Sequence, residues 1–185
     1  MIIWINGAFG AGKSTLASGL REALNGAVIA DPEDVGALLR QSMAGHPRRV
    51  RDYQNYPAWR RLTTRLVTEL HQLATGHVIV PMTILNPAYA AEMFEPLSEL
   101  GTPFHHVVLH AGPDSLEARI AASCEYPGEE ERSEAVRSHR RRRAADYDHA
   151  ATTWLHAATS NVIDTTHLTP GQTLHTVLAH LPVCP

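Results

Sequence analysis

Short apolar segments that show no alternation recur along the chain and predict buried parallel strands. Four of them span residues 2–5, 27–30, 78–80 and 107–109, and a weaker fifth spans residues 162–163. A continuous apolar run is what a strand covered on both faces requires, whereas a half-exposed strand alternates. The runs are rich in β-branched residues and are bounded by polar residues, glycine or proline, which supports their assignment as strands.

Helical patterns fill the intervals between these segments. Their starts lie at Ser14, Asp31-Pro32, Asn86-Pro87, Pro113-Asp114 and Thr169-Pro170. In three of the five, an Asp, Asn or Thr cap precedes a proline at the first helical position, which favours these boundaries. Strands that alternate with helices predict right-handed crossovers and an α/β fold, in which helices flank a five-stranded parallel sheet.

A highly charged segment at about residues 124–158 interrupts the alternation. It includes the run Arg140 to Arg143 and lies between the fourth and fifth predicted strands. We interpret it as a helical lid inserted in a single domain that spans residues 1–185. On a helix, four consecutive arginines point around the whole circumference, so most of them are expected to be solvated or paired. Their expected partners are Glu129, Glu130, Glu131 and Asp146.

The composition narrows the class of protein. The formal net charge is −3 over 185 residues, so no nucleic-acid or membrane partner is expected. No apolar stretch reaches the length of a membrane span, and the apolar start leads directly into a glycine-rich loop, which leaves no room for a signal peptide. Two thiols without metal-ligand spacing, Cys124 and Cys184, fit a reducing compartment. The sequence therefore predicts a cytoplasmic protein.

The first predicted strand is followed by the pattern Gly-x-x-x-x-Gly-Lys-Ser and then by a helix, as in a P-loop or Walker A motif. Glycines let the backbone approach phosphates closely, and the amides and the helix N-terminus form an anion site. Lys13 is the only lysine among 16 basic residues. Its compact ammonium would contact the β- and γ-phosphates of ATP, and the Ser14 hydroxyl would ligate Mg²⁺. The predicted nucleotide-binding loop is Gly7, Ala8, Phe9, Gly10, Ala11, Gly12, Lys13, Ser14 and Thr15.

A P-loop alone is compatible with a kinase, a GTPase, a motor or a simple binding protein. The chain has no Asn-Lys-x-Asp guanine signature and no second domain for mechanical coupling. The compact small-molecule kinases remain. His105-His106 lies in a predicted strand, where alternate side chains face opposite sides, so we expect no bound transition metal.

Residues that follow the strands should form the acceptor wall, because ligands of parallel sheets bind beyond the carboxyl ends of the strands. Asp31 follows the second strand. It could accept the proton of an acceptor hydroxyl or hold Mg²⁺, and it could equally serve only as a helix cap. Many P-loop proteins place a metal-binding acid after the third strand, but here Pro81-Met82-Thr83 follows. The predicted acceptor-binding residues are Asp31, Glu33, Tyr53, Tyr56, Trp59, Arg60, Thr83, Asn86 and Tyr89.

Several of these segments resemble the bacterial tunicamycin-resistance ATP-binding proteins over most of residues 1–112. The resemblance is carried by the stretch from Ile2 to Thr15, by Asp31-Pro32-Glu33, by Tyr56-Pro57-Ala58-Trp59 and by the segment from Ile79 to Ile84. It implies the nucleoside-monophosphate-kinase-like fold and a similarity to chloramphenicol phosphotransferase. It also implies that Asp31 is the acceptor-side acid, that Arg119 packs on adenine, and that the turn containing Thr166 borders adenine.

Together, these observations predict an ATP-dependent phosphotransferase that acts on a hydroxyl of a nucleoside-like or antibiotic small molecule and so confers resistance. The alternative is an ATP-binding protein that sequesters its ligand without chemistry. The predicted cofactors are ATP and Mg²⁺, the predicted partners are a nucleotide and a small acceptor, and the oligomeric state stays open. The predicted catalytic residues are Lys13, Asp31, Arg119 and Arg137, and the predicted Mg²⁺ ligands are Ser14 and Asp31.

Overall fold

The computed structural model of the chain describes residues 1–101 and 103–182. Its sheet has five parallel strands in the order β2-β3-β1-β4-β5, which confirms the predicted fold class. The central strand, β1, pairs with β3 on one side and with β4 on the other. The strands are β1 (Ile2–Gly7), β2 (Val28–Ile29), β3 (Val78–Pro81), β4 (Phe104–His110) and β5 (Val162–Asp164).

Most helices begin where the sequence places a cap. Asp31, Asn86 and Thr169 are N-caps whose side chains accept hydrogen bonds from backbone amides, each with proline at the next position. The helices are α1 (Lys13–Ala23), α2 (Pro32–Ser42), the 3₁₀ turn η1 (Tyr53–Asn55), α3 (Pro57–Leu73), α4 (Pro87–Ser98), α5 (Pro113–Ala122), α6 (Glu130–Ala150), the π turn η2 (Ala151–Leu155) and α7 (Pro170–His180).

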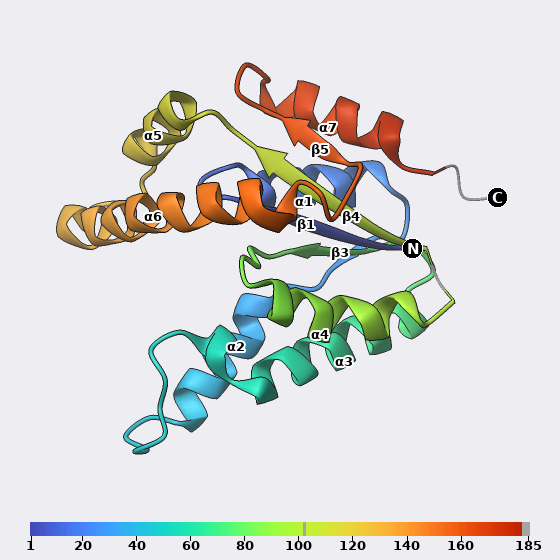
Figure 1. Cartoon of the computed structure of the whole chain (residues 1–185), viewed down its shortest axis with the longest axis horizontal. Helices are drawn as coiled ribbons and strands as arrows, with labels where there is room; N and C mark the ends of the chain where they lie inside the picture. Colours follow the sequence, from blue (N-terminus) through green and yellow to red (C-terminus); the bar gives the residue numbers. More distant parts are fainter. Residues whose placement is uncertain (102, 183–185) are drawn as a thin grey trace.

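The two faces of the sheet bury separate hydrophobic clusters, as the unbroken apolar runs require. On β1, Ile3 and Ile5 pack with residues of α1 and α7, whereas Ile2 and Trp4 pack with residues of α3 and α4. Figure 1 shows α3 and α4 on one side of the sheet and α7 on the other. Because both faces are covered, a ligand is expected beyond the carboxyl ends of the strands, as in other open parallel sheets.

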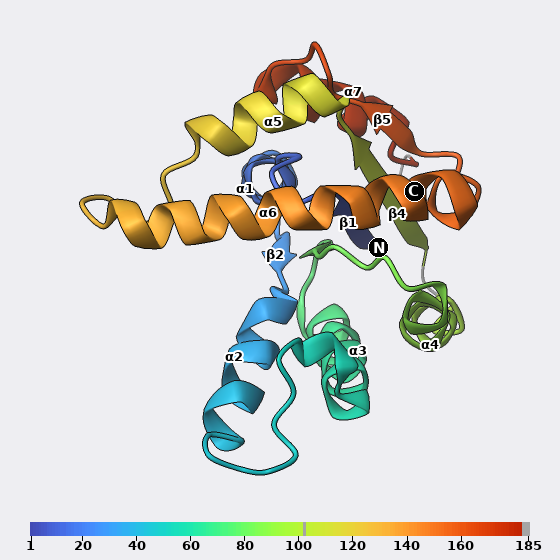
Figure 2. The same cartoon turned by 60° about the vertical axis from the view of Figure 1, so that its left-hand side comes forward.

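Helix α6 runs across that edge (Figure 2). Near its middle, the His139 ring makes an edge contact with Phe9 of the loop after β1, with ring centroids 5.6 Å apart. Near its end, the buried Tyr147 hydroxyl lies 3.1 Å from Nδ1 of His110, the last residue of β4. The charged segment therefore forms one long helix that reaches from the P-loop to the carboxyl end of β4.

Candidate nucleotide and acceptor site

The loop between β1 and α1 forms a cradle of backbone amides. Gly10 and Gly12 have φ of 88° and 98°, a left-handed conformation that favours glycine, and Gly12 is the N-cap of α1. Among the described residues, no acceptor pairs with the amides of Gly10, Gly12, Lys13 or Ser14. These free donors at the start of a helix are the arrangement that binds phosphate oxygens.

Lys13 is held beneath this loop. Its ammonium donates hydrogen bonds to the carbonyls of Ala8 and Gly7, at 2.8 and 3.3 Å. Burial lowers the pKa of Lys13 to about 8, an effect that the carboxylate of Glu33 opposes and the guanidinium of Arg140 reinforces. Without an anion, the loop's own carbonyls thus stabilise the only ammonium side chain of the protein.

The base of the cradle is tied to the segment after β3. The carbonyl of Gly7 accepts a hydrogen bond from the buried Thr83 hydroxyl at 2.8 Å. The buried Asn6 carboxamide accepts from the amides of Gly7 and Ile84 and donates to the carbonyl of Ile84 at 2.9 Å. Sequence reasoning missed Asn6, although a single amide at the end of an apolar strand was a signal. Thr83, predicted to bind the acceptor, instead uses its hydroxyl to hold the loop.

A cavity of about 360 Å³ lies on the outer side of the cradle, and it brings together loop residues and Arg119. The Arg119 guanidinium donates to the hydroxyl and to the carbonyl of Thr165, at 3.0 and 2.5 Å. Thr166, the other residue predicted near adenine, accepts from the Gly112 amide and donates to Asp164. Residues lining the cavity are Gly10, Ala11, Gly12, Thr15, Leu16, Arg119, Leu168, Pro170 and Thr173.

Two carboxylates stand at the start of α2, directly after β2. Asp31 caps the helix, with one oxygen accepting from the Glu33 amide at 2.9 Å, so its expected capping role is confirmed. Desolvation raises the pKa of both carboxyls, and the charge of Asp31 raises that of Glu33 further, while Lys13 lowers it. The charges of Glu33 and Lys13 therefore interact, although the two residues belong to different elements, α2 and the start of α1.

A larger cavity, of about 770 Å³, opens between α2, η1 and α6. Phe9 places it next to the P-loop, and Glu33 and Tyr53 are the predicted acceptor residues that line it. The lining is Phe9, Glu33, Arg40, Arg51, Asp52, Tyr53, Gln54, Asn55, Glu125, Tyr126, Val136, His139, Arg140, Arg142 and Arg143.

A neighbouring cavity of about 360 Å³ shares Asp52, Gln54, Asn55 and Arg143 with the larger one. Asn86 and Tyr89, both predicted to bind the acceptor, line this second space. The Tyr89 hydroxyl donates to the Asn55 carboxamide at 3.0 Å, and the Asn86 side chain caps α4. Its other lining residues are Leu85, Asp146 and His149.

Five of the nine predicted acceptor residues line none of the three cavities. Asp31 and Thr83 are two of them, and the other three, Tyr56, Trp59 and Arg60, support this wall from behind. Trp59 is fully buried, and its indole donates to the carbonyl of Pro32 at 2.9 Å, so it has no surface for a ligand. The buried Arg60 guanidinium pairs with Glu92. The Tyr56 hydroxyl accepts from the amide of Val50. An aromatic cluster in the sequence did not distinguish core packing from a binding face.

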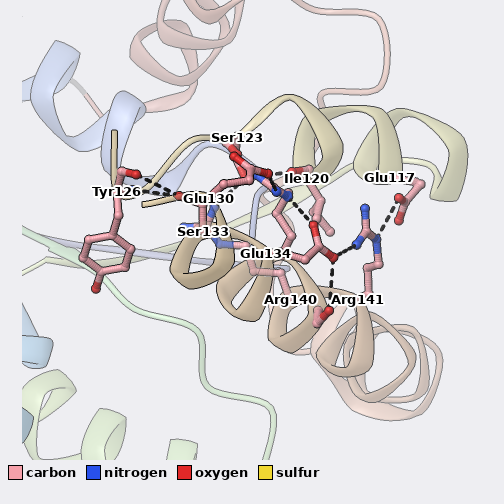
Figure 3. A network of polar contacts seen from close by, with 11 residues as sticks. Glu117, Ile120, Ser123, Tyr126, Glu130, Ser133, Glu134, Arg140 and Arg141 are labelled. Atoms are coloured by element: carbon pink, nitrogen blue, oxygen red, sulfur yellow. Dashed lines mark hydrogen bonds and ion pairs between the residues drawn. The ribbon is translucent and has the colours of Figure 1, made fainter. Parts of the chain in front are cut away.

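Arg137, predicted as a catalytic cation, is also engaged elsewhere. Its guanidinium donates to the carbonyl of Ser123 at 3.0 Å and pairs with Glu130 and with Glu134. These contacts belong to a polar network between α5, the loop after it and α6, shown in Figure 3. Arg137 therefore joins α6 to the preceding loop, and a role on the triphosphate is not compatible with these contacts.

Most other arginines of α6 are paired, as the helical arrangement predicts. Arg140 pairs with Glu125 at 2.6 Å. Arg141 bridges Glu117 and Glu134 at 2.9 and 3.0 Å, as Figure 3 shows. Of the four predicted partners, Glu130, Asp146 and Glu129 take part in ion pairs, the last with Arg132. The other carboxylates that pair with Arg140 and Arg141 are Glu117, Glu125 and Glu134, which the sequence analysis did not name.

A protein family described as an AAA domain matches residues 2–149, which include the P-loop, both candidate acceptor carboxylates and almost all of α6. The chain belongs to this AAA domain family. Membership makes this a nucleotide-binding P-loop domain, in agreement with the free amides of the cradle. Comparison of the sequence with curated proteins gives no significant match.

Solved structures share the fold of this AAA domain over nearly its whole length. The tunicamycin resistance protein of Deinococcus radiodurans superposes with a TM-score of 0.68 at 24% identity, covering 100% of this chain and 98% of that one. A sugar kinase from Janibacter sp. HTCC2649 gives 0.62 at 16% identity, with coverage of 96% and 92%. A gluconokinase from Sinorhizobium meliloti 1021 gives 0.61 at 17% identity, with coverage of 96% and 89%. The kinase-like fold implied by the sequence resemblance is thereby confirmed.

The AAA domain shows neither a cluster of metal ligands nor a membrane-spanning helix within the described residues. Within residues 1–101 and 103–182, no three His, Cys, Asp or Glu side chains gather as a metal site would require. Cys124 is exposed with a free thiol, and Cys184 lies outside the described residues. No helix in the same part of the chain combines the length and apolarity needed to cross a bilayer.

Proposed function

We propose that this protein is an ATP- and Mg²⁺-dependent phosphotransferase that acts on a hydroxyl of a nucleoside-like or antibiotic small molecule in the cytoplasm. The observation that carries the proposal is the juxtaposition of a complete P-loop with a cavity on its acceptor side. Phe9 of the loop and Glu33 of α2 line that cavity together, and the charge of Glu33 acts on Lys13. A site that only held nucleotide would not need this second space.

The residues present fit ATP and Mg²⁺. Free amides at residues 10 and 12–14 are donors for phosphate oxygens, and Lys13 can exchange two carbonyl contacts for the β- and γ-phosphates. The Ser14 hydroxyl has no partner among the described residues, and Asp31 keeps one carboxylate oxygen outside its cap bond. Ser14 and Asp31 would hold the magnesium ion, which neutralises charge on the transferring phosphoryl group.

Asp31 would act as the general base, because desolvation raises its pKa and so makes the carboxylate more basic. The acceptor oxygen would bond to the γ-phosphorus, its proton would pass to Asp31, and the bond to the β,γ-bridging oxygen would break, leaving ADP. Lys13 would stabilise charge on the phosphates, and Arg119 would flank the base of the nucleotide. Helix α6 would be a lid over this site, inserted within one domain.

An antibiotic acceptor is favoured by the resemblance of Ile2 to Thr15 and Ile79 to Ile84 to tunicamycin-resistance proteins. The full-length likeness to the Deinococcus radiodurans protein of that name is consistent with it. Phosphorylation of a hydroxyl adds negative charge to the molecule, and this would prevent an antibiotic from fitting a target that recognises the neutral group.

One observation favours a second candidate, a nucleotide-dependent protein that binds and sequesters its ligand. No acid follows β3, where Met82 and Thr83 stand, and the Thr83 hydroxyl is committed to the Gly7 carbonyl. A single carboxylate residue would then serve both metal and proton. A slow or absent chemical step follows from that shortage.

The test incubates purified protein with Mg-ATP and a panel of nucleoside antibiotics, nucleosides and sugars, and follows acceptor mass. Addition of one phosphate is the expected result, and Asp31→Asn should lower kcat by about 10²- to 10⁴-fold, the usual contribution of a general base. Asp34→Asn, in the same exposed first turn, is the matched control and should keep activity. Acceptor binding without any mass gain, with protection of cells retained in Asp31→Asn, would establish sequestration instead.

A further inference from the structure

The cavity of about 770 Å³ collects positive charge from three separate segments of the chain. Arg40 comes from α2, Arg51 from the connection between α2 and η1, and the arginines at 140, 142 and 143 from α6. Only three carboxylates line the same space: Glu33, Asp52 and Glu125. Five guanidinium groups against three carboxylates leave the lining with two positive charges in excess.

The pairing within the cavity leaves particular arginines uncommitted. Arg140 is paired with Glu125, and Arg143 is paired with Asp146 at 2.9 Å. In contrast, Arg51 and Arg142 have no ion pair or side-chain hydrogen bond with any described residue. Arg40 stacks on the Tyr53 ring, with its guanidinium carbon 4.9 Å from the ring centroid, and acts electrostatically on Glu33 without forming an ion pair with it.

The carboxylates in the lining offset part of this charge, but none forms an ion pair with any of these three groups. Asp52 is occupied as the N-cap of η1, where it accepts from the Gln54 amide at 3.0 Å. Glu33 interacts electrostatically with both Lys13 and Arg40. Exposed arginines on one helix are usually just solvated, but these three converge on one hollow from different elements. Such convergence costs free energy through repulsion unless an anion enters.

The uncommitted arginines lie away from the phosphate cradle. Arg40 is nine residues beyond the cap of α2, which places its backbone roughly 13 Å farther along the helix axis than Asp31. Arg140, by contrast, is close enough to Lys13 to act on its ionisation. Arg51 and Arg142 both act electrostatically on His139, as do Arg143 and the opposing charge of Asp52, so these groups share one part of the cavity.

We propose that the acceptor carries an anionic group, a phosphate or a carboxylate, which Arg40, Arg51 and Arg142 hold at the end remote from the reacting hydroxyl. Planar guanidinium groups match both anions with paired hydrogen bonds, and arginine cannot lose its charge to suit a neutral ligand. The inference rests on the proposed phosphotransferase and narrows its acceptor class. It makes a neutral nucleoside or a neutral antibiotic a poor acceptor compared with its acidic counterpart.

The test measures ligand binding by calorimetry with the P-loop saturated by Mg²⁺ and a non-hydrolysable ATP analogue, so that any further anion must bind elsewhere. The probes are inorganic phosphate, glucose 6-phosphate, gluconate and glucose. At least one of the three anions should bind about tenfold or more tightly than glucose, and added salt should weaken it. The phosphate and carboxylate arms identify which anion the cavity prefers.

Arg40→Gln combined with Arg51→Gln should remove about tenfold or more of that affinity, whereas Arg61→Gln combined with Arg65→Gln, an equal charge change on the exposed side of α3, should not. All variants should bind the ATP analogue as the unmodified protein does, and this shows that they fold. Equal binding of glucose and the anions, no anion binding, or anion binding that survives the double substitution would each overturn the inference. Failure to bind the analogue would instead count against the proposed function.

Discussion

The phosphate cradle and the acceptor wall use their polar groups in opposite ways. In the cradle, residues 7–14, several backbone amides have no partner among the described residues. In the acceptor wall, formed by η1 and the starts of α3 and α4, polar groups pair with one another. Gln54 donates to the carbonyl of Thr83 at 2.8 Å, and Tyr89 donates to Asn55. The cradle therefore keeps donors available for a ligand, whereas the polar groups of the wall mainly stabilise the wall itself.

This difference has a physical origin. A buried polar group without a partner costs free energy, so an element that packs against the core must satisfy its own donors and acceptors. The cradle escapes that requirement because the first amides of a helix lack intrahelical acceptors and here face the solvent edge of the sheet. Substitutions in the two regions should therefore separate binding from stability.

The largest effect is expected from Lys13→Ala in the cradle. Removal of the ammonium should lower kcat/KM for phosphoryl transfer by roughly 10²- to 10³-fold or more, as loss of one charged stabiliser of the transition state does. The free energy of unfolding should hardly change, because the desolvated ammonium of the free protein is already disfavoured and its pKa lowered. Steady-state kinetics and urea unfolding measure the two quantities.

Lys13→Arg provides the stricter comparison. A guanidinium keeps the charge but is planar and bulkier, so it should restore little activity in a space shaped by the Ala8 and Gly7 carbonyls. Near-complete rescue by arginine would mean that only the charge matters. The cradle geometry would then not be the source of catalysis.

In the acceptor wall, Arg60→Met is expected to lower stability and to leave nucleotide binding nearly unchanged. The Arg60 side chain is 8% exposed and pairs with Glu92 at 2.5 Å, while it also donates to the carbonyl of Gln54. Its loss should cost roughly 2 kcal/mol of stability, below the cost of breaking a fully buried pair because Glu92 is 41% exposed and can turn to water. Urea unfolding measures this cost, and affinity for ATP should stay within about twofold.

Arg61→Met is the matched control, since Arg61 is the exposed neighbour on the same helix. It should leave both stability and nucleotide affinity unchanged. A large loss of ATP affinity in Arg60→Met would show that the wall and the cradle are energetically coupled. The separation of binding from stability would then fail.

The same contrast explains how much of the molecule the sequence could predict. All five strands, the capped starts of α2, α4 and α7, and the P-loop follow from local rules, in which neighbouring residues interact. Glycine at φ of 98° and proline after a cap act over a few residues, so a pattern reveals them. The cradle was therefore predictable in detail.

The acceptor wall was not predictable, because its contacts join distant residues. Trp59 donates to Pro32 and Arg60 pairs with Glu92, at separations of 27 and 32 residues. The aromatic and guanidinium groups that suggested ligand recognition instead make these contacts within the protein. The cation excess of the large cavity was hidden for the same reason, since Arg40, Arg51 and Arg142 are brought together only by folding.

The smallest effect concerns the pH dependence of nucleotide binding. It connects the two regions, because the charge of Glu33 on the acceptor side raises the pKa of Lys13 in the cradle. Lys13 has a lowered pKa of about 8, and a bound triphosphate favours its charged form, so binding above that pH must take up a proton. Affinity for Mg-ATP should therefore fall about tenfold between about pH 7.5 and about pH 9, as the free protein loses this proton. Since the Glu33 charge raises the pKa of Lys13, Glu33→Gln should move the fall to lower pH. Calorimetry in buffers of different ionisation enthalpy counts the protons taken up on binding. The Lys13→Arg variant does not titrate in this range, so its affinity for Mg-ATP should not fall with pH. An affinity of the unmodified protein that stays constant over this range would place the ammonium away from the triphosphate.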